Sequence, residues 1–277
     1  MNSSPNVSSF TDAALNYLIQ NGNFDAISSS SLFDPVLIAK LFTSTGLYCI
    51  YSLLTIEKSS KRFGFGLDSL SLDYCELILS LALSTCVFGY FTFFENRDPL
   101  VSVTLGRGPM FLYLMKSVLN WDSKYSIIHR GRKGKKAYFS LFFGFCLNSV
   151  LVYMGSSAAA YTMKASLTFG LLQGVSSMMN TSARVKELNG LEAAERESVL
   201  AMHRCSAMLT IQYCSFALGL VTNMKATRAY GLAILATLGC MLYKNFVLED
   251  VKRNNFNKRE SNFWMLTYAA VAARMLV

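Results

Sequence analysis

A dense run of basic residues stands directly before a long apolar run near the middle of the chain. Residues 127–136 contain five Lys or Arg side chains and one His, and residues 137–163 carry no charged side chain. This pattern is typical of a transmembrane helix that Lys and Arg hold at the cytoplasmic side of a membrane. It predicts a membrane protein, and the other apolar runs decide how many times the chain crosses.

The composition supports the same class. Only 16% of the 277 residues are charged and 52% are hydrophobic, whereas roughly 25% of the residues in a soluble domain are charged. The apolar residues gather in runs close to the ~20 residues that cross ~30 Å of hydrocarbon as a helix. The expected fold is therefore all-α, a polytopic membrane bundle of seven or eight transmembrane helices. The basic residues stand in short loops and not on a water-exposed face, so no nucleic-acid partner is expected despite the net charge of +9.

Eight apolar segments are candidate spans within one domain that covers residues 35–277. They are 35–56, 75–94, 99–120, 137–158, 161–179, 205–223, 229–247 and 263–277. The third is interrupted by Gly106-Arg107-Gly108-Pro109, so it either crosses the membrane, lies at its surface, or enters and breaks. Residues 1–34 are rich in Ser and Asn and lack Lys and Arg, and they are expected to form a polar, mobile tail.

Lys and Arg are concentrated in every second loop, and successive spans place these loops on the same side of the membrane. With eight spans and the N-terminus outside, the four inner loops hold 17 of the 26 Lys and Arg residues; these loops are 57–74, 121–136, 183–204 and 248–261. A seven-span arrangement, in which the third segment does not cross and the N-terminus is inside, gives the last three loops the same side. The charges that flank the first span favour eight.

Side chains that could carry out catalysis or bind a metal are scarce in the apolar segments. The cysteines, interpreted as small buried side chains, form no CxxC pair; they are Cys49, Cys75, Cys86, Cys146, Cys205, Cys214 and Cys240. His129 and His203 each precede an Arg at a loop edge, which indicates interfacial positions and leaves too few histidines for a haem or di-iron site. All 17 carboxylates lie outside the apolar runs or at their edges, which disfavours proton-coupled transport and aspartyl proteolysis. No catalytic residue, metal or cofactor is predicted.

The break in the third segment is the candidate binding site. A half-helix that begins near Pro109 would direct unpaired backbone N–H groups, at the positive end of its dipole, toward the same place as the Arg107 guanidinium. Such an arrangement suits a phosphate or a carboxylate. The predicted anion-binding residues are Arg107, Gly106, Gly108 and Lys116. The alternative interpretation of these cations is that their long side chains reach lipid headgroups at the membrane surface.

Two further groups of residues are expected to make contacts. Small residues at Gly155, Gly170 and Gly174 would let neighbouring helices approach closely. The basic run would contact anionic lipid through Arg130, Arg132, Lys133, Lys135 and Lys136. The expected partners are thus membrane lipids, above all anionic ones, and further membrane subunits.

These features lead to a ranked set of functional hypotheses. The first is a non-enzymatic membrane scaffold or accessory subunit that packs through small-residue helices and presents basic cytoplasmic loops. The alternative is a transporter or channel for a small anionic solute, and the second alternative is a membrane-embedded lipid-modifying enzyme. A eukaryotic endomembrane is the expected location.

Overall fold

The structure, a computed structural model, describes residues 34–119, 132–254 and 258–276. Within these ranges the chain forms helices and no β-strand, which confirms the predicted all-α bundle. Apart from Asp34, the predicted N-terminal tail lies outside the described residues, as do His129 and Arg130 of the basic run.

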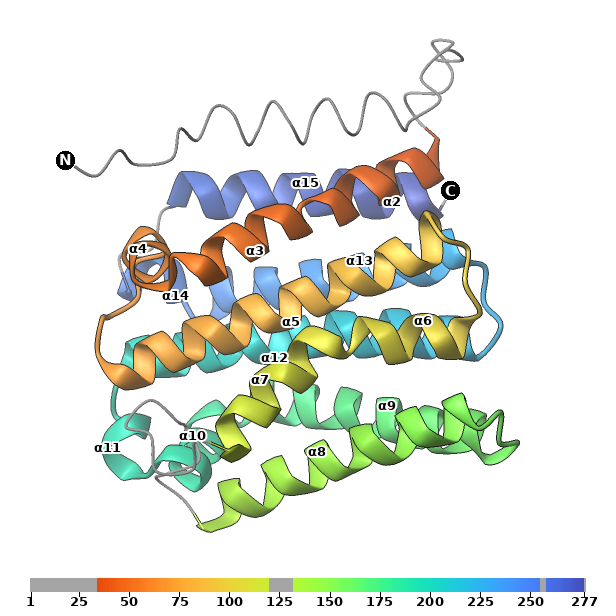
Figure 1. Cartoon of the computed structure of the whole chain (residues 1–277). Coiled ribbons are helices and arrows are strands. Elements are labelled where there is room, and N and C mark those ends of the chain that lie inside the picture. The colour runs from red at the N-terminus through yellow and green to blue at the C-terminus, as the bar shows by residue number, and fades with distance from the viewer. Residues whose placement is uncertain (1–33, 120–131, 255–257, 277) are drawn as a thin grey trace, which may run out of the picture.

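Short connections join most of the helices, whereas residues 120–131, between α7 and α8, lie outside the described residues. Their bounds are α2 (Pro35–Ser44), α3 (Gly46–Leu54), α4 (Ile56–Arg62), α5 (Ser69–Phe93), α6 (Pro99–Gly106), α7 (Gly108–Leu119), α8 (Arg132–Tyr153), α9 (Ala158–Met179), α10 (Thr181–Asn189), α11 (Leu191–Ala194), α12 (Glu197–Val221), α13 (Ala226–Leu242), the π-helical turn η4 (Tyr243–Val247), α14 (Asp250–Arg253) and α15 (Lys258–Leu276). The long helices lie side by side, most of them nearly parallel or antiparallel (Figure 1).

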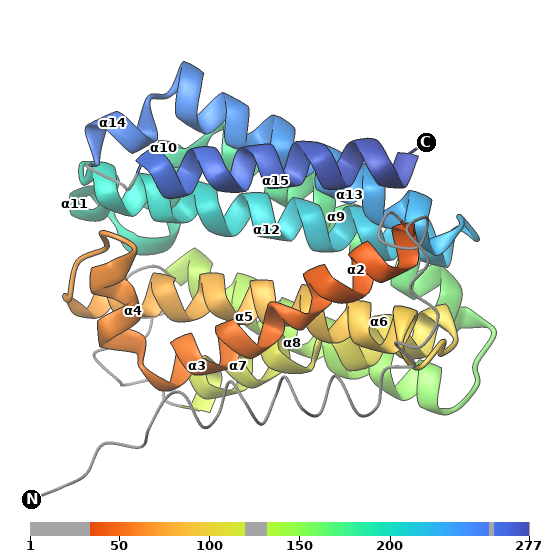
Figure 2. The ribbon, with the colours of Figure 1, turned by 90° about the horizontal axis from the view of Figure 1, so that it is seen from above.

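The bundle has two layers, which Figure 2 shows from above. Helices α2 to α8 form one layer, and helices α9, α12, α13 and α15 form the other (Figures 1 and 2). Helix α5 is central in the first layer and contacts α2, α3, α6 and α7, while α12 is central in the second and contacts α9 and α13. These two helices also pack against each other, so the core lies along the α5–α12 interface.

Local sequence signals set where several helices begin. Asp98 precedes Pro99, the first residue of α6, and its Oδ1 accepts hydrogen bonds from the N–H groups of Leu100 (2.9 Å) and Val101 (3.3 Å). An Asp cap satisfies backbone donors that have no partner within the helix, and Pro at the first position has no N–H to leave unpaired. Asp34 before Pro35 starts α2 in the same way.

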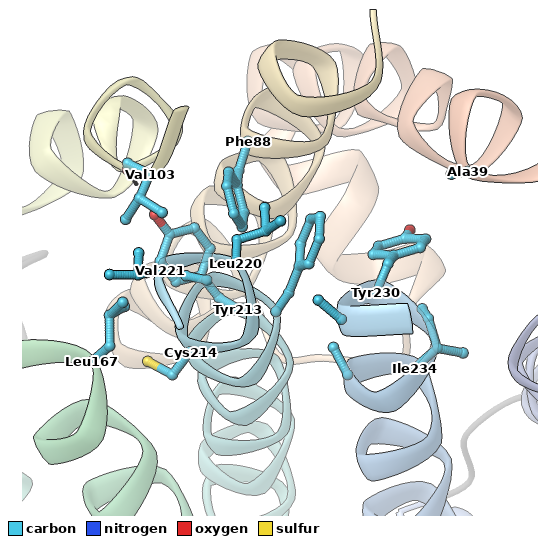
Figure 3. Close-up of a cluster of buried hydrophobic side chains, with 14 of the residues drawn as sticks. Ala39, Phe88, Val103, Leu167, Tyr213, Cys214, Leu220, Val221, Tyr230 and Ile234 are labelled. Atoms are coloured by element: carbon cyan, nitrogen blue, oxygen red, sulfur yellow. Dashed lines mark hydrogen bonds between the residues drawn. The ribbon is translucent and has the colours of Figure 1, made fainter. Parts of the chain in front are cut away.

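Aromatic rings fill the core between the two layers. The Phe88 ring lies 4.3 Å from the Phe216 ring, centroid to centroid, and Phe216 lies 4.9 Å from Tyr230. Figure 3 shows Phe88 of α5, Tyr213 of α12 and Tyr230 of α13 among the side chains of this cluster. Ring pairs at these separations add specific contacts to the close packing, which fixes α13 and α5 around α12.

Three helical stretches are long and apolar enough to cross a membrane, which is fewer than the seven or eight predicted. They are Pro35–Leu54, Ser69–Phe93 and Ala226–Val247. The others fall short for identifiable reasons. The third predicted span is broken into α6 and α7, and the apolar part of α8 covers only Tyr138–Tyr153. Helix α9 is long enough but contains Lys164 and many small polar residues, and α12 and α15 include charged residues.

Two segments differ from their predicted form. The stretch 183–204, predicted as a loop between two spans, is helical nearly throughout, because Val185, Ala193 and Val199 are buried in the bundle. The last apolar stretch, predicted over 263–277, belongs to a helix that begins at Lys258. In both places tertiary packing extends helix into polar sequence.

Candidate anion site at the break between α6 and α7

The chain bends at Arg107, where α6 ends and α7 begins (Figure 1). Pro109 has no N–H, so the carbonyl of Leu105 loses the hydrogen bond that it would receive in a continuous helix. The N–H of Met110 donates to Ser84 Oγ on α5 at 3.1 Å, and the N–H of Phe111 donates to the Arg107 carbonyl at 2.8 Å. The break therefore has a local cause in the sequence, and α5 holds its second half in place.

Gly106 brings the break close to α5. A Cβ atom at Gly106 would lie 2.5 Å from Phe88 Cβ and 2.8 Å from its Cα, so no larger residue fits without a shift of the backbone. Gly108, on the other side of Arg107, would meet no atom within 4 Å. Arg107 directly follows this close approach, and the residue is only 5% exposed.

The Arg107 guanidinium has few partners for a buried cation. Its Nη2 donates to Ser166 Oγ on α9 over a long 3.4 Å, and its carbon lies 4.8 Å from the centre of the Phe145 ring on α8. Its Nε and Nη1 are buried and bond to no atom of the described residues. A guanidinium has five N–H donors, so most of the donor capacity of Arg107 is open.

The surroundings of Arg107 are apolar or already hydrogen-bonded. The Tyr213 hydroxyl of α12 donates to the Val103 carbonyl at 2.9 Å, and Figure 3 shows this hydroxyl directed toward Val103. Val103 O also accepts from the Arg107 backbone N–H at 3.1 Å. Leu167 and Cys214, both buried, flank the same region of α9 and α12 (Figure 3). The Tyr213 hydroxyl thus uses its hydrogen on Val103, and its oxygen lies close enough to the Arg107 guanidinium to interact with it.

The site lies deep along the bundle. Ser166 is eight residues from the start of α9 and Phe145 is eight residues from the end of α8, so each lies about 12 Å from the turn that joins the two helices. Charges at such depth interact far more strongly than in water, because little solvent screens them. A guanidinium there with open donors is a strong attractor for a negative group.

Lys116, the other predicted cation of this site, does not lie there. Its ammonium pairs with Glu76 of α5, and its side chain is 50% exposed. Lys116 follows Arg107 by nine residues on a helix, or about 13 Å along the axis. The prediction for Lys116 was wrong, because Glu76, at the edge of an apolar run, meets it across the helix pair.

The three predicted packing glycines occupy two kinds of position. A Cβ atom at Gly170 would lie 2.8 Å from Cys214 Sγ, and one at Gly174 would lie 2.8 Å from Ile211 Cγ1. Both glycines thus face α12 across a close α9–α12 contact. Gly155 faces open space and has a φ of 63°, so it belongs to the turn between α8 and α9 and the packing prediction was wrong there.

The basic run is described only in part. Arg132, Lys133 and Lys135 belong to the first turn of α8, and Lys136 is exposed. A basic first turn is unusual because the N-terminal end of a helix carries positive dipole charge. The contact of these residues with anionic lipid stays a prediction.

A second polar cluster, which the sequence did not indicate, lies where α5, α10 and α12 meet. The Tyr74 hydroxyl donates to Asn189 Oδ1 at 3.0 Å and lies 3.2 Å from His203 Nδ1. His203 is therefore buried, and its predicted interfacial position was wrong. Burial, helped by the positive charges of Arg204 and Arg184, lowers the pKa of His203 to about 4, so the imidazole is neutral at pH 7.

Arg204, next to that histidine, has the partners that Arg107 lacks. Its Nη2 lies 2.7 Å from Asp250 Oδ1 and its Nε donates to Asp250 Oδ2 at 2.9 Å, while Glu197 lies 3.6 Å away. Asp250 stands 46 residues along the chain, after the π-helical turn, so no sequence spacing could have paired them. This cluster closes one end of the bundle.

Thiols and metal ligands give no further site in the described ranges. All seven cysteines are free, and no three His, Cys, Asp or Glu side chains of residues 34–119, 132–254 and 258–276 converge as metal ligands. Comparisons with protein-family models, with curated proteins and with solved structures found no match. Function is therefore inferred from the side chains themselves, and among the described cations Arg107 has two buried nitrogens, Nε and Nη1, without a hydrogen-bond partner.

Proposed function

We propose that the protein is a non-enzymatic, multi-pass membrane protein that binds a small anion at Arg107, inside its helical bundle, and carries that anion across the membrane. The observation that supports this function is the buried guanidinium, 5% exposed, with Nε and Nη1 open and a single long hydrogen bond to Ser166. An arginine in an apolar interior is costly unless a negative group pairs with it.

The immediate surroundings of Arg107 make an external anion the natural partner. The guanidinium contacts a hydroxyl and an aromatic ring, and it forms no ion pair with any described Asp or Glu. A cation–π contact with Phe145 stabilises the charge by about 2 kcal/mol or somewhat more when it is desolvated. That is smaller than the several kcal/mol that desolvation of an ion costs, so a bound anion would restore the balance.

The proposed membrane arrangement has eight crossings. Three stretches meet the length and apolarity that a span needs, and the remaining long helices lie beside them in the same bundle (Figures 1 and 2). The crossings would place loops 121–136, 183–204 and 248–261 at the cytoplasmic side. Single cysteines at Ser126 and Asn255, in a background without the native cysteines, should react with an impermeant reagent from the same side. Labelling from opposite sides would exclude this arrangement.

A scaffold or accessory subunit is the competing function. It is supported by the outer faces of α8 and α9, where large apolar side chains are exposed, among them Phe143 (63%), Leu147 (56%), Tyr161 (78%) and Leu172 (63%). These faces suit lipid or the helices of a partner subunit. In a scaffold, Arg107 would have no ligand and anions would not affect the stability of the protein.

Anion-dependent stability decides between the two functions. Purified wild type, Arg107→Gln and the control Arg97→Gln are unfolded by heat in detergent with a panel of anions at constant ionic strength. Arg97 suits the control because it is an exposed arginine near the start of α6. An anion at a hundred times its dissociation constant should stabilise wild type and the control by ~2.7 kcal/mol, and Arg107→Gln should not respond.

Flux measurements complete the test. In liposomes, wild type and Arg97→Gln should transport the anion that stabilises them, and Arg107→Gln should transport none. If no anion stabilises the wild type, the anion function fails and the scaffold function is retained. If an anion binds at Arg107 but liposomes show no flux, binding stands and transport fails.

A further inference from the structure

We infer that the anion held at Arg107 carries a single negative charge, as a halide, nitrate or small carboxylate does. This inference rests on the proposed anion function and names the class of ligand for the same site. It follows from the number of charges and of open hydrogen-bond donors around the guanidinium.

The charge balance of the site allows one negative charge. Arg107 is the cation of the site: Lys116 is engaged with Glu76, and Lys164 lies two residues from Ser166, which turns its side chain about 200° away around α9. One monovalent anion makes the buried pair neutral. A divalent anion would leave a net negative charge in an apolar interior, where an uncompensated ion costs several kcal/mol.

The open donors also fit a small ligand. Nε and Nη1 are free, and Ser166 Oγ accepts from Nη2, which leaves the serine hydroxyl hydrogen to donate. The Tyr213 hydroxyl donates its hydrogen to the Val103 carbonyl, so toward this site it offers only an acceptor oxygen, which lies near the guanidinium. One guanidinium and one hydroxyl can satisfy a halide or the two oxygens of a carboxylate, but they leave much of the surface of a sulfate or hydrogenphosphate without donors.

The aromatic ring of Phe145 defines where the anion lies. The ring covers one face of the guanidinium, and its own face carries partial negative charge. An anion is therefore excluded from that face and approaches the N–H groups in the plane of the guanidinium. A planar carboxylate or nitrate, or a spherical halide, meets this condition.

The test compares anions of different charge on the purified full-length protein. Thermal unfolding is followed at pH 8 and constant ionic strength, with a bulky organic sulfonate as the replaced anion, while chloride, nitrate, formate, sulfate or hydrogenphosphate is titrated in. At least one monovalent anion should stabilise wild type saturably, with an apparent Kd about tenfold or more below that of either divalent anion. Ser166→Ala should raise the Kd and keep the preference for one charge.

The possible results of this titration separate the charge of the ligand from the location of the site. Sulfate or hydrogenphosphate could stabilise wild type as strongly as the monovalent anions do, with the effect lost in Arg107→Gln. That result would overturn the inference of a single charge, while the anion site at Arg107 would stand. Equal stabilisation of Arg107→Gln by monovalent anions would place the site elsewhere and overturn both. If Arg107→Gln does not fold, Arg107→Lys keeps the charge and removes the planar donors, and it should weaken the monovalent anions by about tenfold or more. An unchanged Kd in Arg107→Lys would overturn the role of the guanidinium donors.

Discussion

Arg107 and Arg204 are both buried in the same bundle, at 5% and 7% exposure, but they differ in what surrounds them. Arg204 forms two short contacts with Asp250, which is fully buried, whereas Arg107 has one long hydrogen bond to a hydroxyl. A buried arginine that is paired with a carboxylate has its charge neutralised within the protein. Burial alone therefore does not mark a binding site, whereas open donors on a buried charge do.

The two arginines also differ in their access to water. The Arg204 cluster continues outward through Glu197 to Arg253, whose side chain is 54% exposed. Arg107 is enclosed by Phe145, by the break in its own helix and by α9. Solvent therefore screens the outer part of the Arg204 cluster, and it screens Arg107 much less.

The two buried arginines should differ in what substitution does to the stability of the fold. Removing the carboxylate partner of Arg204 should destabilise the fold, whereas removing Arg107, which has no such partner, should not. Asp250→Ala leaves Arg204 buried without its carboxylate and should destabilise the fold by about 3–5 kcal/mol. Arg107→Gln removes a cation without a carboxylate partner and should leave the stability unchanged or increased in the absence of an anion. Thermal or denaturant unfolding in detergent measures both.

The double variant Arg204→Met/Asp250→Leu serves as the control for the Asp250 substitution. Replacing both members of a buried ion pair by apolar side chains of similar size is often neutral, so the double variant should be more stable than Asp250→Ala. A loss of stability in Arg107→Gln as large as that in Asp250→Ala would contradict the proposed difference, because it would mean that Arg107 stabilises the fold as Arg204 does.

Acid should weaken the Arg204 end of the bundle through His203. The pKa of His203 is about 4 in the folded protein, lowered by burial, Arg204 and Arg184, against about 6.5 in an unfolded chain. The stability that the fold has while His203 is neutral is fully present above pH 6.5. It is lost as the pH falls toward 4, because the histidine of the unfolded chain binds a proton first. The loss amounts to about 3 kcal/mol at most.

The pH dependence of unfolding in wild type and in His203→Gln isolates this effect. Wild type should lose stability between pH 6.5 and 4, and the variant should have a flatter profile over the same range. Arg107→Gln should retain the wild-type profile, because Arg107 is not among the groups that shift the pKa of His203. Identical slopes in wild type and His203→Gln would show that the histidine is not held neutral.

The sequence predicted the helical class and the break at Arg107, because both depend on local signals. Long apolar runs identify helices, and Gly-Arg-Gly-Pro interrupts one of them. The partners of the charged residues were not predictable from sequence spacing. Asp250 meets Arg204, and Glu76 meets Lys116, through contacts between segments about 40 residues or more apart.

The composition also did not indicate which polar residues are buried. His203 and Asp250 stand in charged stretches, which indicated positions at the surface, yet both are buried. The cause is that α10, α11 and α14 fold back over the ends of the long helices and cover them. A single sequence shows where polar residues are frequent, but it does not show which of them a later segment encloses.

The smallest expected effect concerns a third arginine, Arg196, which is paired but exposed. Arg196 Nη2 lies 2.8 Å from Asp68 Oδ2, with side chains 36% and 41% exposed. Burial raises the pKa of Asp68, but hydrogen bonds from Arg196 and Ser71 outweigh it and hold this pKa at about 2. The stability that the ionised Asp68 carboxylate contributes is therefore present above pH ~3.9, the pKa of Asp in an unfolded chain. It is lost as the pH falls toward 2.

Arg196→Gln should cost less than about 1 kcal/mol, because solvent screens an exposed pair, and 1 M salt should remove most of the difference from the parent. The comparison is made in an Arg107→Gln background, so that anion binding at Arg107 adds nothing to the salt response. Asp68→Asn is the matched variant, because Asn still caps α5 through Ser71 while the charge is lost. A salt-insensitive loss of several kcal/mol in Arg196→Gln would contradict this, since it would place the exposed pair in the same class as Arg204 and Asp250.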